Sequence, residues 1–209
     1  DQGLFAGSNF ILSVLLARWL SANDYGAFSI GLTIFWMIGT IHTGLLSEPM
    51  LVFGPGKFKS CLAQYTAFMF RGHSAFSFVI MTLLAATGTL FLLHHDVILA
   101  QVFFALAPGQ IFILLLWMMR KACYVQLRPH IAALGGGIYA LIMLPSAYVL
   151  FTYHVLNPWT AIGLMSAACL TAAGVIFMLL RRNPFMKVPS AIAADALRYH
   201  LAYGRWAAA

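Results

Sequence analysis

The chain has 209 residues, of which 62% are hydrophobic and only 8% are charged. Soluble domains carry roughly 25% charged residues, so this composition excludes a surface that faces water and indicates one that faces lipid. The formal net charge of +7 can indicate nucleic-acid binding. Here the basic residues lie between long apolar runs, so we assign them to lipid headgroups and cytosol and expect no nucleic-acid partner.

Six apolar runs are long enough to cross a bilayer, whose hydrocarbon core about 30 Å thick needs about 20 residues of helix. They cover residues 3–20, 27–47, 74–93, 97–119, 131–151 and 159–180. None alternates like a barrel strand, and each is too long for one. The sequence therefore predicts an all-α integral membrane protein, with a six-transmembrane-helix bundle over residues 1–189.

The connections between these runs alternate in charge. Those after the second, fourth and sixth runs hold eleven of the twelve Lys and Arg residues: Lys57, Lys59, Arg71, Arg120, Lys121, Arg128, Arg181, Arg182, Lys187, Arg198 and Arg205. Those after the first, third and fifth runs hold none. Basic loops stay on the cytoplasmic side of a membrane, so we expect both the N- and the C-terminus in the cytoplasm.

Two cytoplasmic segments are longer than simple turns. Residues 53–72 begin with a Gly-Pro-Gly turn at Gly54 and predict a short helix over residues 62–69. In residues 190–209, Ile192, Leu197 and Leu201 can share one face of a helix. We expect this segment to lie along the membrane surface as a linker and to lead into a seventh helix.

The two ends of the chain look cut. It begins at Asp1 without a basic leader, and it ends in an apolar run that has barely begun. We therefore expect it to be a segment of a longer protein.

Arg18 and Glu48 are charged residues close to the apolar runs. Arg18 lies near the outer end of the first run, and a charge in a membrane helix is costly and normally faces a cavity or a partner. It can bind an anion in a central cavity, or it can reach the outer headgroups beside Asp24. Glu48 lies at the end of the second run. It can bind a coupling cation, it can act as a gate for transport, or it can form a structural ion pair.

Asn9, His42 and Gln110 are polar residues inside the first, second and fourth runs. Such side chains commonly form hydrogen bonds between helices. The alternative is that they line a polar cavity that binds substrate.

Nothing in the sequence predicts a catalytic or metal centre. His94, His95 and Asp96 are consecutive but have no fourth ligand in sight, so we interpret them as a solvated turn. The cysteines at positions 61, 123 and 169 lie far apart, which argues against a disulfide or zinc framework. Nucleophile elbows, phosphate-binding loops and paired carboxylates are all missing. We expect neither enzymatic activity nor a cofactor.

Three short motifs stand in the first 28 residues: an Asn-Phe pair at Asn9, an Ala-Arg-Trp-Leu stretch at Arg18 and a Tyr-Gly-Ala-Phe turn at Tyr25. With these motifs, the first 60 residues resemble the polysaccharide and O-antigen flippases of the multidrug/oligosaccharidyl-lipid/polysaccharide exporter superfamily. The Ser-Glu-Pro and Val-Phe-Gly-Pro stretches of residues 47–49 and 52–55 also look familial, as does Tyr-Gly-Arg-Trp at residues 203–206. The four remaining runs match only as apolar spans.

The resemblance implies one six-helix lobe of a two-lobed transporter, with the C-terminal lobe of the same protein as the missing partner. Its implied activity is flipping of a polyprenyl-pyrophosphate-linked oligosaccharide, by alternating access, across a bacterial inner (plasma) membrane. A cation such as Arg18 would hold the pyrophosphate, because attraction is strong where water is restricted. The superfamily also makes coupling to a H+ or Na+ gradient plausible.

Three other functions remain open on sequence. A drug/cation antiporter of the same superfamily would need acidic residues in mid-span, which these runs lack. An integral-membrane enzyme of envelope polysaccharide assembly would need a larger external loop than any here. A membrane scaffold of the same assembly pathway is the third alternative.

Overall fold

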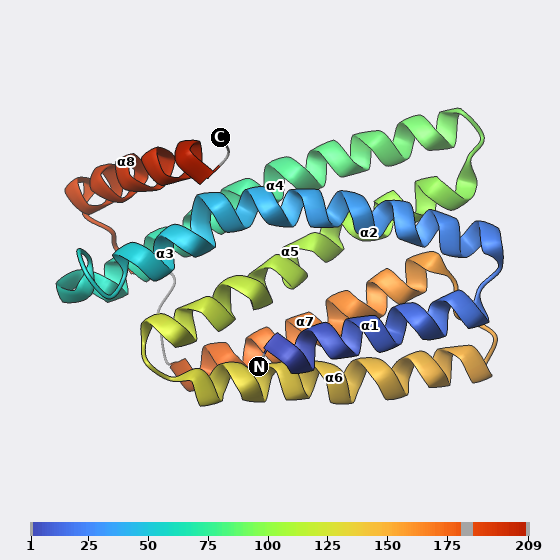
Figure 1. Ribbon diagram of the computed structural model, residues 1–209. Helices are drawn as coiled ribbons and strands as arrows, with labels where there is room; N and C mark the ends of the chain where they lie inside the picture. The colour runs from blue at the N-terminus through green and yellow to red at the C-terminus, as the bar shows by residue number, and fades with distance from the viewer. Residues whose placement is uncertain (1, 181–185, 208–209) are drawn as a thin grey trace.

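The computed structural model describes residues 2–180 and 186–207, which are almost entirely helical and contain no strand. The α-helices are α1 (Gln2–Trp19), α2 (Ala22–His42), α3 (Glu48–Phe53), α4 (Leu62–Leu93), α5 (Val97–Val125), α6 (Pro129–Thr152), α7 (Pro158–Leu180) and α8 (Ser190–Ala207). A π-helical turn, η1 (Thr43–Ser47), joins α2 to α3, and a 3-10 turn, η2 (Lys59–Cys61), precedes α4. Figure 1 shows the long helices running back and forth along one axis.

Five helical segments of the described residues are long and apolar enough to cross a membrane: Ala22–Phe53, Lys59–Leu93, Val97–Val125, Pro129–Thr152 and Pro158–Leu180. This confirms the prediction of an all-α, multi-pass membrane protein. The first helix, α1, is not among the five. It has only 18 residues, and Gln2, Asn9 and Arg18 lower its hydropathy. A sixth span at α1 and the side of each terminus stay predictions.

Three helix boundaries differ from those expected. The second segment begins at Ala22 and continues through η1 to Phe53. The short helix expected at residues 62–69 and the span expected at 74–93 form one helix, α4, because the Gly72 between them costs a helix only about 1 kcal/mol. The fourth predicted run continues from Met119 to Val125, since Arg120 and Lys121 are good helix formers.

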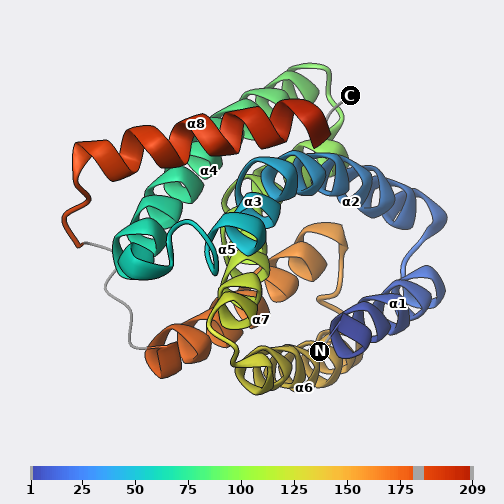
Figure 2. The same ribbon diagram turned by 60° about the vertical axis from the view of Figure 1, so that its left-hand side comes forward.

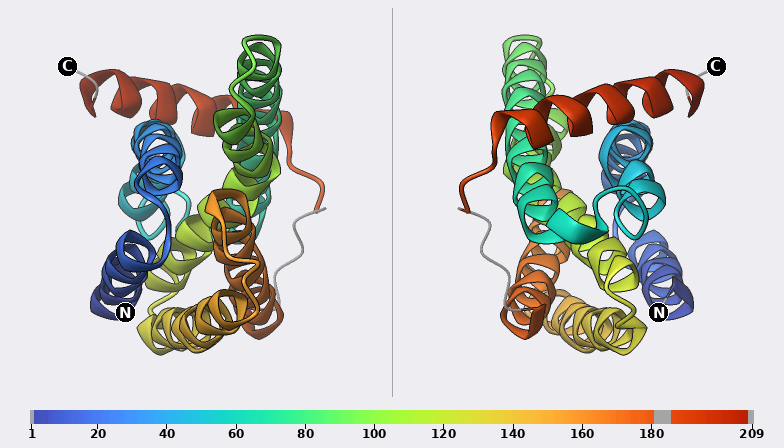
Figure 3. Two further views of the ribbon diagram at one scale, coloured as in Figure 1. Left: turned by 90° about the vertical axis from the view of Figure 1, so that its right-hand side faces the viewer. Right: turned by 90° about the vertical axis from the view of Figure 1, so that its left-hand side faces the viewer.

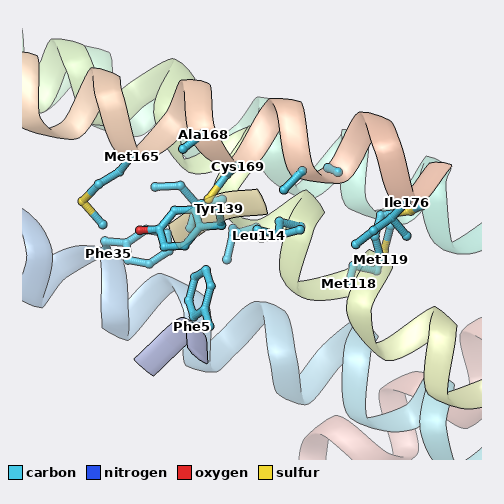
Figure 4. Close-up of a cluster of buried hydrophobic side chains, with 14 of the residues drawn as sticks. Phe5, Phe35, Leu114, Met118, Met119, Tyr139, Met165, Ala168, Cys169 and Ile176 are labelled. Carbon is cyan, nitrogen blue, oxygen red and sulfur yellow. The ribbon is translucent and has the colours of Figure 1, made fainter. Parts of the chain in front are cut away.

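The helix α5 lies in the middle of the bundle, between α4 and α7 (Figure 3). Side chains from α5, α6 and α7 fill the core, including Leu114, Met119, Tyr139 and Ile176, each no more than 2% exposed (Figure 4). Glycines allow the helices to approach closely at two places. A β-carbon at Gly109 would lie 2.5 Å from Ser166 Oγ of α7, and one at Gly135 would overlap Ile176.

The helix α8 crosses α3 and α4 near one end of the bundle (Figure 2). Pro49 lacks a backbone N–H, so the Leu45 carbonyl cannot accept the usual α-helical hydrogen bond from residue 49. His200 of α8 supplies a donor instead: its Nδ1 lies 2.8 Å from the Leu45 oxygen. The Tyr65 hydroxyl, 2.6 Å from His200 Nε2, donates to the other side of the ring. The break between α2 and α3 thus creates the docking position of α8.

We expect the docking of α8 to weaken in acid. Burial lowers the pKa of His200 below its ordinary value of 6.5, although the hydrogen bond to Leu45 opposes this effect. The undocked ring therefore binds a proton more readily than the docked ring. Docking is at full strength above about pH 6.5 and weakens as the pH falls below it, toward the lowered pKa of the docked state.

Replacing His200 by Ala should cost this docking about 1–3 kcal/mol, because it leaves the Leu45 carbonyl and the Tyr65 hydroxyl without His200 as a partner. Hydrogen exchange of α8 amides, followed against pH, measures both effects. The matched control is Arg198→Ala, since Arg198 lies on the exposed face of the same helix. Equal protection of α8 in both variants would contradict the docking role.

Candidate functional site

Two neighbouring cavities lie along the cleft between α1 and α2. The first has a volume of about 260 Å³ and the second about 340 Å³. Phe5, Ala6, Trp36 and Trp117 line both of them, so the two are parts of one continuous cleft. The cleft exists because α1 packs mainly on α6 and touches α2 only briefly, an arrangement that Figure 3 shows end-on.

The first cavity is apolar and aromatic. The Trp117 ring contacts Phe5, Phe35 and Trp36, with ring centroids 6.5, 5.4 and 5.3 Å away. Trp117 can reach this position because α2 has a glycine opposite it: a β-carbon at Gly39 would lie 2.8 Å from the indole. The surface that this half of the cleft offers to a ligand is therefore made of aromatic side chains and not of charged ones.

Asn9 gives the first cavity one of its few polar groups. Its amide is fixed at both ends: Nδ2 donates to the Phe5 carbonyl at 2.9 Å, and Oδ1 accepts from the Tyr139 hydroxyl at 2.8 Å. Tyr139 lies in α6 and is fully buried. The Asn9–Tyr139 hydrogen bond thus attaches α1 to α6 and helps to keep the cleft beside α2 open.

The second cavity has a cationic wall. Arg120 and Lys121 of α5 line it, together with the polar side chains of Gln2, Thr43 and Ser47. Arg120 is largely buried, with its guanidinium 4.8 Å from the centre of the Phe5 ring. Lys121 Nζ lies 2.7 Å from Glu48 Oε1. Two cationic side chains thus line this end of the cleft, and the Glu48 carboxylate pairs with one of them.

The cationic wall can hold an anion. Arginine offers a planar fork of N–H donors that matches phosphate oxygens, and a charge pair interacts more strongly where water is restricted. The arrangement suits a ligand with a strongly negative group at one end of the cleft and a less polar group at the other.

The structure brings together only some of the residues singled out in the sequence. Asn9 lines the first cavity, and Glu48 pairs with a residue of the second. Arg18 is exposed near the opposite end of α1 and lines neither cavity. His42 and Gln110 are fully buried and also line neither: His42 contacts His73 of α4, and Gln110 donates to the Ser77 carbonyl.

The sequence interpretation missed Arg120 and Lys121 as residues of the cleft, because it ended the fourth run at Met119 and placed both in a cytoplasmic loop. The signal that could have found them is the apolar stretch that follows, residues 122–125. It continues the helix for another turn, and so keeps position 120 on the same face as Trp117.

Within residues 2–180 and 186–207, no three His, Cys, Asp or Glu side chains lie close enough together to hold a metal ion.

Comparison of the chain with models of protein families, with curated proteins and with solved structures finds no match.

Proposed function

We propose that the chain is one six-span lobe of a transporter that flips a polyprenyl-pyrophosphate-linked oligosaccharide across a bacterial inner membrane. The lobe has both termini in the cytoplasm and works by alternating access with a second lobe. The observation that carries the proposal is the cleft between α1 and α2, with its aromatic half and its cationic end.

The cleft matches the chemistry of such a substrate part by part. The pyrophosphate binds at Arg120 and Lys121, and the uncharged sugar extends into the aromatic half of the cleft. The polyprenyl chain stays in the bilayer, against the apolar outer faces of α1 and α2. Under the positive-inside orientation the cationic end opens toward the cytoplasm, the side from which an inside-to-outside flippase collects its substrate.

The same cleft argues against export of cationic drugs. Among residues 2–180 and 186–207, no Asp or Glu side chain lines either cavity. Glu48, the carboxylate that approaches the cleft, is paired with Lys121. A cationic drug would instead meet the Arg120 and Lys121 side chains in this part of the cleft.

The test is translocation of a fluorescent polyprenyl-pyrophosphate oligosaccharide in proteoliposomes containing the full-length protein, with empty liposomes as the control. We expect protein-dependent flipping, with inorganic pyrophosphate as a competitor from the cationic side. A folded protein that flips none of several lipid-linked sugars would refute the proposal, and flipping of a lipid-linked cation instead would favour the antiporter.

A further inference from the structure

A pair of histidines is buried between α2 and α4, outside the cleft. His42 is 0% exposed and His73 is 3% exposed. His42 Nε2 lies 3.0 Å from His73 Nδ1, and the two rings meet edge to face at 88°. Because α2 and α4 touch little elsewhere, this hydrogen bond is a main polar link between them.

The pair has room for one more proton. Two neutral imidazoles have four ring nitrogens and two N–H groups. One N–H makes the shared hydrogen bond, and the other occupies one outer nitrogen, which leaves the second outer nitrogen bare. Neither outer nitrogen, His42 Nδ1 nor His73 Nε2, has a hydrogen-bond partner of good geometry within the described part of the chain, and the Ile111 backbone of α5 is the polar group beside the His73 ring. A proton can bind the bare one without breaking the shared bond, which becomes charge-assisted and stronger.

Within the described part of the chain, no charged side chain pairs with either histidine. On the elements packed around the pair, charged and titratable side chains have other contacts: Glu48 with Lys121, Tyr65 with His200, Arg71 with the Met186 carbonyl, and Arg120 with Phe5. Tyr124 of α5 also has an interaction of its own. An unpaired charge is costly in a dry interior. Protonation therefore favours a conformation in which the pair meets water, and deprotonation favours the closed one shown here.

A third cavity, of about 180 Å³, lies beside the pair, between η1, α4 and α8. Phe76 lines it and also contacts His42, with ring centroids 5.3 Å apart. Gly72, the neighbour of His73 in the sequence, lines it as well. Phe76 thus contacts both this cavity and the histidine pair.

We propose that the His42–His73 pair is a proton-binding site, and that the proton is the ion coupled to transport. The coupling rests on the proposed function, whereas the proton site does not. In each cycle an N–H bond forms at the bare outer nitrogen, and the proton later leaves from an outer nitrogen to water on the other side. The protein exchanges one proton and no electrons.

The variant that isolates proton binding is the double substitution His42→Gln and His73→Asn. The Gln amide nitrogen takes the place of His42 Nε2, and the Asn oxygen takes the place of His73 Nδ1. The hydrogen bond between α2 and α4 is kept, and neither amide titrates. His94→Gln is the control, because His94 is exposed in the turn between α4 and α5.

The readout is the distribution of lipid-linked sugar between leaflets at steady state, with and without a pH gradient. One proton per substrate predicts a shift of up to about tenfold for each pH unit, or about 1.4 kcal/mol. We expect this shift in the wild type and in the His94 control, and none in the double variant. A wild type without the shift, or a double variant that keeps it, would overturn the proposal.

Nitrogen NMR of ¹⁵N-histidine-labelled protein in nanodiscs separates the proton site from the transport function. If the full-length protein flips nothing, the proposed function fails, but the site is still decided by this measurement. Coupled titration of the two rings between about pH 5 and 8 supports the proton site. Rings that stay neutral throughout that range, in a protein that does not transport, would overturn it.

Discussion

Replacing Arg120 by Gln is expected to slow flipping of the lipid-linked oligosaccharide by about 10- to 100-fold. The guanidinium lines the second cavity and is largely buried, and a hydrogen bond to a charged group contributes about 1.5–3 kcal/mol, with 1.4 kcal/mol corresponding to tenfold. The measurement is the initial flipping rate at saturating and at limiting substrate. Thermal unfolding of the variant shows whether it is folded.

Arg18→Gln is the matched control for this substitution, since both arginines lie on helices, α1 and α5, but only Arg120 lines the cleft. Arg18 is exposed and lines neither cavity, so we expect less than about a fivefold change, the range of a surface charge of 0–1 kcal/mol. If Arg18→Gln carries the loss and Arg120→Gln does not, the anion binds at the outer end of α1, as the flippase resemblance implies.

Replacing Gly135 by Leu is expected to destabilise the bundle by about 1–3 kcal/mol, the usual cost of overpacking a core. Position 135 lies where α6 meets α7, and a β-carbon there would overlap Ile176. A larger side chain forces the two helices apart along the core shown in Figure 4. Unfolding in mixed micelles, followed by tryptophan fluorescence, measures the loss.

Gly137→Leu provides the control within the same helix. A β-carbon at position 137 meets nothing within 4 Å, so the added side chain extends into open space. The stability should stay the same or rise by up to about 1 kcal/mol, because leucine is the better helix former. Equal destabilisation by both substitutions would show that the helix itself, rather than the contact with α7, needs glycine.

Much of the architecture could be read from the sequence because the bilayer imposes it. A backbone in lipid must satisfy its own hydrogen bonds, so apolar runs of this length can only be helices, and five of the expected spans are confirmed. The boundaries were harder to predict. Charged residues such as Arg120 and Lys121 end an apolar run in the sequence, but they do not end a helix. The helix α5 therefore continues to Val125.

The candidate sites show what local patterns cannot supply. Asn9 was singled out for its polarity and does line the cleft. His42 and Gln110 were singled out for the same reason and are buried elsewhere. The sequence around His73 and His200 contains no motif that predicts a role for either residue, since each is an ordinary polar residue in its own segment. Their roles come from partners 31 and 155 residues away, His42 and Leu45.

The sequence by itself determined that this protein is a helical, multi-pass membrane protein with its positive charges at alternate connections, because hydropathy and charge act locally along the chain. Only the tertiary structure decided which faces meet. In it, a cleft lies between α1 and α2, and Arg120 lines that cleft. His42 contacts His73, and α8 docks through His200 on the Leu45 carbonyl, which cannot accept a hydrogen bond from Pro49. Each of these depends on helix rotation and close packing, which arise when distant segments come together and have no signature within a single run.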